Sequence, residues 1–222
     1  MATTLQGTAA DGHTFGIYRA EPAGRPRGGL VVVQEIFGVN RHIRAVCDDY
    51  AGQGYVAVAP ALFDRVERDV ELGYQADDVT RGRAIREKVS LEQALADVEA
   101  AAKEVAGAGR IGVIGYCWGG TVAWVAATRS RAFAAAVSYY GGGVPDLAKE
   151  QPNCPVQLHF GEQDQAIPLE GVERLKAAHP ELAVYLYPAG HGFNCDQRAS
   201  YHAESARLAR ERTLAFLRDH IG

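Results

Sequence analysis

The sequence predicts one α/β domain with a mainly parallel central sheet and helices packed on both faces. Short β-branched apolar runs alternate with segments of helical periodicity along most of the 222 residues, an order typical of parallel strands joined by helices. Apolar residues make up 47% of the chain and charged residues 23%, which is ordinary for a globular protein that buries a full core. We therefore expect residues 1–222 to form a single domain.

The chain is expected to begin with an antiparallel hairpin and to continue with buried strands and covering helices. Two runs of alternating polarity, residues 3–9 and 14–20, flank Asp11-Gly12, a dipeptide that favours a hairpin turn. Continuous apolar runs predict buried strands, and apolar residues spaced by three or four positions predict helices. These patterns place strands at residues 30–35, 55–59, 110–114, 134–139, 156–160 and 183–187, and helices at residues 40–53, 91–107, 118–128, 169–178 and 201–219.

Residues 61–89 differ from the rest of the chain because they are more charged and less periodic. We expect this segment to leave the core and to border the active site. Ser90 and Gln93 follow it with the spacing of a capping box. A new helix is therefore expected to begin at Leu91.

Charge and hydropathy exclude several classes of partner. The chain has 23 Lys and Arg against 27 Asp and Glu, a net charge of −4, so it lacks the basic excess that holds a phosphate backbone. Its longest apolar runs, residues 29–33 and 132–137, are far shorter than the roughly 20 residues of a membrane span, and its first residues do not resemble a signal peptide. We expect a cytoplasmic monomer or small homo-oligomer without nucleic-acid or membrane partners.

A cysteine follows the predicted strand at residues 110–114 in the pattern Gly115-Tyr116-Cys117-Trp118-Gly119. This is the arrangement of a nucleophile elbow, in which a sharp strand-to-helix turn holds the nucleophile at a helix N-terminus. The N–H groups there can stabilise an oxyanion, and the helix dipole favours a thiolate. Taken alone, the motif is equally compatible with a buried structural cysteine between closely packed elements.

Two further residues complete a catalytic pattern. Asp164 and His191 each follow a later predicted strand, and the carboxyl ends of parallel strands meet at one edge of the sheet. The chain order Cys117, Asp164, His191 is the order of nucleophile, acid and histidine in α/β-hydrolases. Each residue alone could be structural, but the three together predict a Cys-His-Asp triad.

With these motifs the chain resembles the dienelactone hydrolase family, α/β-hydrolases with a cysteine nucleophile. The resemblance covers nearly the whole chain, and it implies Cys117, Asp164 and His191 as the catalytic residues. It rests on the segments Gln34-Glu35-Ile36-Phe37-Gly38-Val39-Asn40, Gly115-Tyr116-Cys117-Trp118-Gly119-Gly120, Tyr139-Tyr140-Gly141, Gly161-Glu162-Gln163-Asp164 and His191-Gly192-Phe193.

The resemblance also implies roles for residues around the nucleophile. The backbone N–H groups of Trp118 and Ile36 would hold the oxyanion, and Glu35 would interact with the thiol and take part in its activation. A carboxylate beside a thiol can take its proton or repel its thiolate, so a change in its partners would change reactivity. The resemblance implies no metal or organic cofactor.

Substrates of the family resemble small lactones that carry a carboxylate, such as 4-carboxymethylenebut-2-en-4-olide, which is opened to maleylacetate. Arginine suits such an anion because its planar fork pairs with carboxylate, and Arg81 falls where the family places one arginine. Phe37 and Tyr139 are further expected substrate-binding residues.

One part of the expected carboxylate site departs from the family pattern. Family members carry His-Ser-Phe-x-Arg after the last strand, whereas this chain has Gly192 and Cys195 at the Ser and Arg positions. Arg198 and Arg83 are the candidates to replace the missing arginine.

Two alternative functions remain open from the sequence. One is a cysteine-elbow glyoxalase, deglycase or redox sensor that pairs its cysteine with a glutamate near the first strand and has no use for Asp164 and His191. The other is a binding module that keeps the fold without catalysis. Retained function in His191→Ala would favour the first, and a Cys117 thiol that is inert to iodoacetamide at neutral pH would favour the second.

Overall fold

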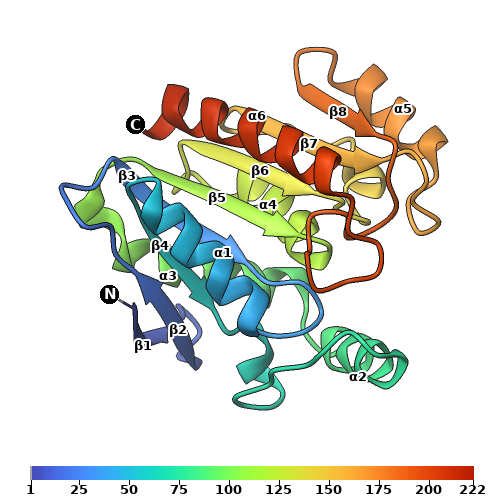
Figure 1. Ribbon diagram of the computed structural model, residues 1–222. Coiled ribbons are helices and arrows are strands. Elements are labelled where there is room, and N and C mark those ends of the chain that lie inside the picture. Colours follow the sequence, from blue (N-terminus) through green and yellow to red (C-terminus); the bar gives the residue numbers. More distant parts are fainter. Residues whose placement is uncertain (1) are drawn as a thin grey trace.

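A computed structural model describes residues 2–222, and their central feature is an eight-stranded sheet (Figure 1). The strand order is β1-β2-β4-β3-β5-β6-β7-β8. The pairs β1–β2 and β2–β4 are antiparallel, and the pairs from β4–β3 to β7–β8 are parallel. The strands are β1 (Ala2–Thr8), β2 (Thr14–Ala20), β3 (Gly28–Val33), β4 (Tyr55–Pro60), β5 (Ile111–Tyr116), β6 (Ala135–Tyr139), β7 (Val156–Gly161) and β8 (Ala183–Tyr187).

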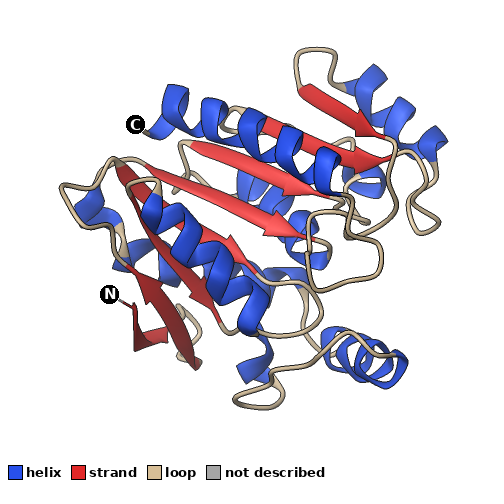
Figure 2. Ribbon diagram, in the orientation of Figure 1, coloured by secondary structure: helices blue, strands red, loops and turns tan. Residues whose placement is uncertain are grey.

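Helices cover both faces of the sheet, as Figure 2 shows: α1 and α6 lie on the near face, with α3 and α4 behind the sheet. None of the helices within residues 2–222 has the length and apolar character needed to cross a bilayer. The α-helices are α1 (Arg41–Gly52), α2 (Ala76–Arg86), α3 (Leu91–Glu104), α4 (Trp118–Arg129), α5 (Leu169–Ala178) and α6 (Ala203–Ile221), and three short 3-10 helices span Leu62–Arg65, Ala106–Ala108 and Pro145–Leu147.

Local patterns account for most of these elements, and the predicted α/β class is confirmed. Every residue of β3 and β4 is buried, as continuous apolar runs require. The Asn40 side chain accepts a hydrogen bond from the Ile43 N–H and so caps α1. Ser90 forms the predicted capping box of α3. The single bond of the Asn40 cap and the two bonds of the Ser90 box satisfy N–H groups that the helix itself cannot.

The segment 61–89 only partly matches its prediction. Leu62 and Phe63 are buried in the core, so the first part does not leave it. The second part contains α2, a helix that the sequence did not predict because only Gly82 and Ile85 of its residues are buried. Helix α2 lies apart from the main body, beyond the carboxyl ends of the central strands (Figure 1).

Strand register determines which loops meet at that edge of the sheet. Val33 at the end of β3 pairs with Gly115 of β5, so the segments that follow both strands emerge side by side. Gly161 at the end of β7 pairs with Tyr187 at the end of β8. The residues that follow these four strands therefore gather at one edge, where ligands bind in open parallel sheets.

Candidate active site

Cys117 occupies a sharp turn between β5 and α4. Its backbone has φ 56° and ψ −120°, a conformation that L-residues rarely adopt and that costs about 1–3 kcal/mol. Glycine on either side makes the turn possible: a Cβ added to Gly115 would lie 1.8 Å from the carbonyl oxygen of Gly119. The strained turn presents a partly exposed Cys117 thiol at the start of α4, as the elbow motif predicts.

Asp164 and His191 form a hydrogen-bonded pair beside this turn. His191 Nδ1 lies 2.7 Å from Asp164 Oδ2, and Asp164 Oδ1 accepts a hydrogen bond of 2.8 Å from the Ala166 N–H. Because Nδ1–H donates to the carboxylate, Nε2 is left to face a reacting group. The Asp164 side chain is fully buried, whereas the His191 side chain is partly exposed.

The electrostatics of His191 depend on its two anionic neighbours. Burial by itself disfavours the imidazolium, but the Cys117 thiolate and the Asp164 carboxylate outweigh it and raise the pKa of His191 to about 10. His191 is therefore protonated at neutral pH while the thiolate is present. This arrangement provides a nucleophile and an acid side by side.

Two residues expected to supply oxyanion N–H groups border the cavity that Cys117 lines. Trp118 is the first residue of α4, so its N–H has no carbonyl of that helix to bind. Ile36 follows β3, and its carbonyl touches α2 at Gly82, where a Cβ would lie 2.0 Å from the Ile36 oxygen. Ile36 and Trp118 line the same cavity as Cys117, so the structure brings these expected residues together.

That cavity, which we call the elbow cavity, has a volume of about 360 Å³. Its lining combines the nucleophile region with apolar side chains and three arginines, which favour an anionic ligand of small size. The lining residues are Ile36, Phe37, Val79, Arg83, Arg86, Glu87, Cys117, Trp118, Thr121, Gly142, Gly143, Ala166, His191 and Arg198.

The buried Glu35 forms an ion pair with Arg198, a partly exposed residue of the elbow-cavity lining. Glu35 is 1% exposed, and its Oε1 accepts a hydrogen bond of 3.1 Å from Arg198 Nη1. The Arg198 guanidinium also lies over the rings of Phe37 and Tyr74, at 5.6 and 6.0 Å from their centres. Burial opposes the Arg198 charge, but Glu35 more than compensates and raises the pKa of Arg198 further.

Gly192 explains how Arg198 reaches this position. A Cβ at Gly192 would lie 2.3 Å from Arg198 Nη1, and Gly192 has a positive φ of 77°. The serine and arginine that the family pattern places at positions 192 and 195 are thus both replaced, and Arg198 occupies space that a larger residue at 192 would fill. Gly192 in the sequence indicated this exchange. The contact between Gly192 and Arg198 could not be predicted, because it depends on how the loop after β8 folds back on itself.

Two expected substrate-binding residues do not reach the elbow cavity, whereas Phe37 lines it. Arg81 is half exposed and pairs with Glu67 at 2.5 Å, because it lies on a face of α2 that points away from the cavity lining. Tyr139 is buried within the sheet layer, where its hydroxyl bonds Thr213 at 2.7 Å. Neither residue is among those that line the elbow cavity, and their substrate-binding roles stay predictions. The sequence missed Arg86, which is on the lining.

Among residues 2–222, one group of side chains has the composition of a metal site. Glu35, His42 and Cys195 are all buried, and one potential ligand atom of each lies within 4.8 Å of the others. The four cysteines are free thiols.

Comparison with known proteins gives a consistent family. A family model described as the dienelactone hydrolase family matches residues 15–221. A protein of Escherichia coli (strain K12) named "Putative carboxymethylenebutenolidase" is 35% identical over 96% of this chain and 85% of its own length. One of the same name from Synechocystis sp. (strain ATCC 27184 / PCC 6803 / Kazusa) is 37% identical over 85% of each chain.

A solved structure agrees with this result. The crystal structure described as "Putative Dienelactone Hydrolase" from Klebsiella pneumoniae subsp. pneumoniae MGH 78578 superposes with a TM-score of 0.84 and 33% identity. The superposition covers 97% of this chain and 98% of that chain. The two chains therefore share their fold over almost their whole length.

Proposed function

Because the chain belongs to the dienelactone hydrolase family, a family of ester and lactone hydrolases, we propose that it opens a small carboxylated lactone or ester through a thioester on Cys117. One observation carries the proposal. Cys117 and His191 line one cavity, and Asp164 lies behind His191 at a hydrogen-bond distance of 2.7 Å. A nucleophile, an acid–base group and its orienting carboxylate are the parts that acyl transfer requires.

In the first half of the proposed reaction, the Cys117 thiolate attacks the carbonyl carbon and forms a C–S bond. The carbonyl oxygen becomes an oxyanion between the N–H groups of Trp118 and Ile36, where donors fixed in advance stabilise the developing charge. The ring C–O bond then breaks. The His191 imidazolium protonates the departing enolate or alkoxide oxygen, a role that suits a group whose pKa is raised to about 10 by its anionic neighbours against the opposing effect of burial.

In the second half, water hydrolyses the thioester. Neutral His191 accepts a proton from the water as its oxygen attacks the acyl carbon, and the C–S bond breaks to return the Cys117 thiolate. Asp164 keeps the imidazole in the tautomer that presents Nε2 to both steps. The product carries one new carboxylate and one new hydroxyl, which becomes a ketone when the leaving group is an enol.

The arginines of the elbow cavity support a substrate that carries a carboxylate. Arg198, Arg83 and Arg86 line the cavity, and guanidinium groups bind carboxylates in two-point geometry. We place Arg198 in the role that the family pattern gives to an arginine at position 195, and Arg83 and Arg86 in place of Arg81. Phe37 supplies an apolar wall for the ring.

Glu35 completes the proposal as a group that tunes the thiol. Its Oε1 is held by Arg198 at 3.1 Å. A substrate carboxylate that binds Arg198 competes with Glu35 for the guanidinium, and the freed Glu35 charge then raises the energy of the neighbouring thiolate. The reactivity of the Cys117 thiolate would then increase when substrate binds. The proposal also includes a cytoplasmic enzyme that acts as a monomer or small homo-oligomer.

The direct test is the rate at which 4-carboxymethylenebut-2-en-4-olide is opened, followed by ultraviolet absorbance, with wild type and Cys117→Ala side by side. A neutral ester, 4-nitrophenyl acetate, is measured in parallel. Turnover of the lactone that disappears in Cys117→Ala supports the whole proposal. Turnover of the neutral ester alone would contradict the carboxylated substrate, and equal activity of both proteins would contradict the nucleophile.

A further inference from the structure

A second group of buried polar side chains shares Glu35 with the Glu35–Arg198 pair and adds His42 and Cys195, which the proposed reaction does not use. Glu35 follows β3, His42 is the second residue of α1, and Cys195 lies in the loop between β8 and α6. They are 1%, 4% and 0% exposed. Three segments far apart in the sequence thus converge on one buried point.

Two atoms of this group lack partners. Among residues 2–222, Glu35 Oε2 and His42 Nε2 are buried side-chain atoms without a hydrogen-bond partner. A buried polar atom left unpaired costs about 1–3 kcal/mol, and more for a charged group, so such atoms are rare in folded proteins and need a reason. One carboxylate oxygen and one imidazole nitrogen are therefore left unpaired in a group whose potential ligand atoms, the Cys195 sulfur among them, lie within 4.8 Å of one another.

We propose that Glu35 Oε2, His42 Nε2 and Cys195 Sγ bind one Zn²⁺ ion or a first-row transition metal of similar preference. The three potential ligand atoms lie within 4.8 Å of one another. A tetrahedral Zn²⁺ ion holds its ligand atoms roughly 3.3–3.8 Å apart, given bond lengths of about 2.0–2.3 Å. Side-chain rotations that move these atoms by about 1 Å bring them to that spacing.

The donor set favours this class of metal. One thiolate, one imidazole and one carboxylate form a mixed set that suits Zn²⁺, whereas Ca²⁺ and Mg²⁺ prefer oxygen ligands alone. Three protein ligands leave a fourth position for water. When the metal–sulfur bond forms, the Cys195 thiol proton passes to water, and no oxidation state changes.

The surroundings provide the outer support that metal-binding histidines need. Asp196 Oδ1 lies 3.4 Å from His42 Nδ1, on the ring nitrogen opposite the proposed metal. A carboxylate in this position fixes the tautomer that leaves Nε2 free to bind a metal. The carboxylates of Glu35 and Asp196 and the Cys195 thiolate also balance the charges of the ion and of Arg198.

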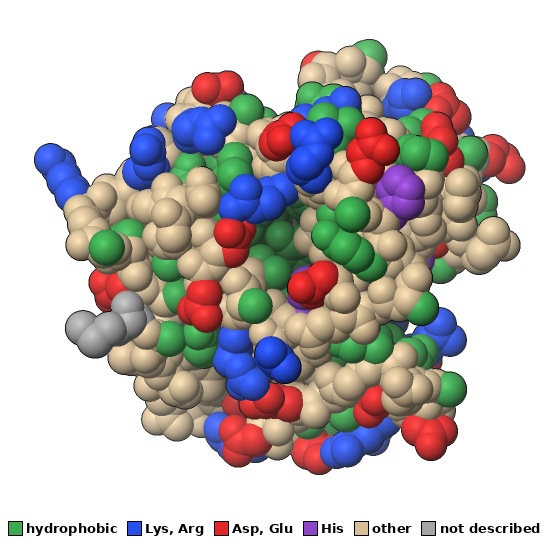
Figure 3. Space-filling model, in the orientation of Figure 1, with side chains coloured by type: hydrophobic (Ala, Val, Ile, Leu, Met, Phe, Trp, Pro, Cys, Tyr) green, Lys and Arg blue, Asp and Glu red, His purple; other side chains and the backbone are tan. Residues whose placement is uncertain are grey.

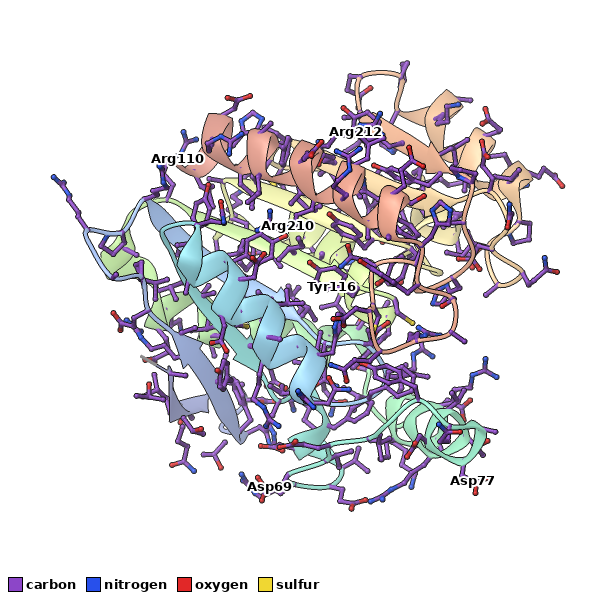
Figure 4. All side chains as sticks on the ribbon, viewed as in Figure 1. Asp69, Asp77, Arg110, Tyr116, Arg210 and Arg212 are labelled. Atoms are coloured by element: carbon purple, nitrogen blue, oxygen red, sulfur yellow. The ribbon has the colours of Figure 1, made fainter. Side chains whose placement is uncertain are left out.

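A second hollow, separate from the elbow cavity, borders the buried group at His42. His42 and Asp196 line a second hollow of about 370 Å³, together with Tyr116 and Arg210. Figure 3 shows this face of the molecule hollowed between α1 and α6, and Figure 4 shows Tyr116 and Arg210 in the same region. An ion could enter here without passing the nucleophile.

The test uses Co²⁺ as an optical probe in a Cys117→Ser protein, which removes the other thiol that lies beside a histidine. We expect one Co²⁺ per chain, with visible ligand-field bands and a near-ultraviolet charge-transfer band from thiolate to metal. Added Zn²⁺ should abolish both bands by displacement. A protein without saturable Co²⁺ binding would overturn the proposal.

Three further variants of that protein assign the ligands. Cys195→Ser should lose the charge-transfer band, while the matched control Cys154→Ser keeps it. Asp196→Asn, a change at an exposed residue that leaves the core intact, should weaken binding by about tenfold and keep the band. A band that survives in Cys195→Ser, or an affinity in Asp196→Asn equal to that of the parent, would contradict the assigned site.

Discussion

Two histidines have opposite electrostatics: His159, which is buried within β7, and His191, which is partly buried in the loop after the neighbouring strand β8. His159 lies inside β7, where burial lowers its pKa to about 3. His191 follows β8, and although burial also opposes its charge, the Cys117 thiolate and Asp164 carboxylate raise its pKa to about 10. Burial without an anion produces a neutral structural histidine, whereas burial beside two anions produces an acid.

The partners of His159 explain its neutral state. Its Nδ1 lies 2.7 Å from the Tyr187 hydroxyl, and its Nε2 lies 3.0 Å from Gln157 Oε1. The amide oxygen can only accept, so Nε2 carries the proton and Nδ1 accepts from the hydroxyl. Arg212 donates to the same hydroxyl at 3.1 Å, which further disfavours a second positive charge.

The largest expected effect is at the nucleophile that gives His191 its charge. Cys117→Ala should lower kcat for lactone and ester by about 10⁶-fold, the scale seen when a catalytic nucleophile is removed. Steady-state kinetics on both substrates measure this loss. The matched control, Cys154→Ala, replaces another free and partly buried cysteine and should retain full activity. Equal rates in Cys117→Ala and Cys154→Ala would contradict the role of Cys117 as the nucleophile.

The next effect comes from the carboxylate that orients His191. Asp164→Asn should reduce kcat by about 10⁴-fold, because the amide no longer holds the productive imidazole tautomer. The pKa of His191 should also fall, since Asp164 is one of the groups that raise it. A pH–rate profile reports both changes. Asp219→Asn, a change at an exposed residue, is the control. If Asp164→Asn were about as active as this control, Asp164 would not orient His191.

A smaller effect separates Arg198 from Arg81. Arg198→Gln should lower kcat/KM for the carboxylated lactone by about 10–100-fold, the value of one charge-assisted hydrogen bond, while KM for a neutral ester changes little. Arg81→Gln should leave both substrates unaffected, because Arg81 is half exposed and pairs with Glu67. The reverse result would return Arg81 to the role that the sequence predicted for it.

The smallest expected effect on catalysis is at the other histidine. His159→Gln should leave turnover per folded molecule unchanged but lower the free energy of unfolding by about 1–3 kcal/mol, because it leaves buried partners unpaired. Denaturant unfolding at neutral pH measures the loss. Turnover that falls with intact stability would mean that His159 takes part in the chemistry.

The pH dependence of stability in wild type and His159→Gln tests the neutral state of His159. The unfolded chain protonates His159 near its ordinary pKa of 6.5, whereas the folded chain does so only at about 3. The stability due to neutral His159 is thus present above pH 6.5 and falls by about 1.4 kcal/mol per pH unit as the pH decreases toward 3. His159→Gln should show a shallower acid dependence by that amount; parallel slopes would contradict the buried neutral state.

The fold was largely predictable because most of its elements are defined by local patterns. Continuous apolar runs mark β3 and β4, and side-chain caps mark the starts of α1 and α3. Helix α2 was not predictable in this way, since it buries little. Its position depends on a tertiary contact, the packing of Gly82 against the Ile36 carbonyl.

In the candidate site too, residues marked by local sequence patterns were predictable, and residues placed by tertiary contacts were not. Cys117, Asp164 and His191 could be selected because each follows a strand and strand ends converge in a parallel sheet. Arg198 could be named with Arg83 as a candidate for the missing arginine, but its contact with Glu35 could not be predicted, because it depends on the room that Gly192 leaves for it. His42 gave no signal at all: its helical position predicts a solvated or structural role, and only the packing of α1 against the last loop buries it beside Glu35.

The nucleophile can be identified most directly by trapping its acyl form. Wild-type protein is mixed with 4-nitrophenyl acetate, quenched in acid within the first turnover and digested for peptide mass spectrometry, with His191→Ala as a variant in which the thioester should persist. We expect one acetyl group per chain on the peptide that contains Cys117. An acetyl group on another residue, or turnover without an acylated protein, would contradict the account.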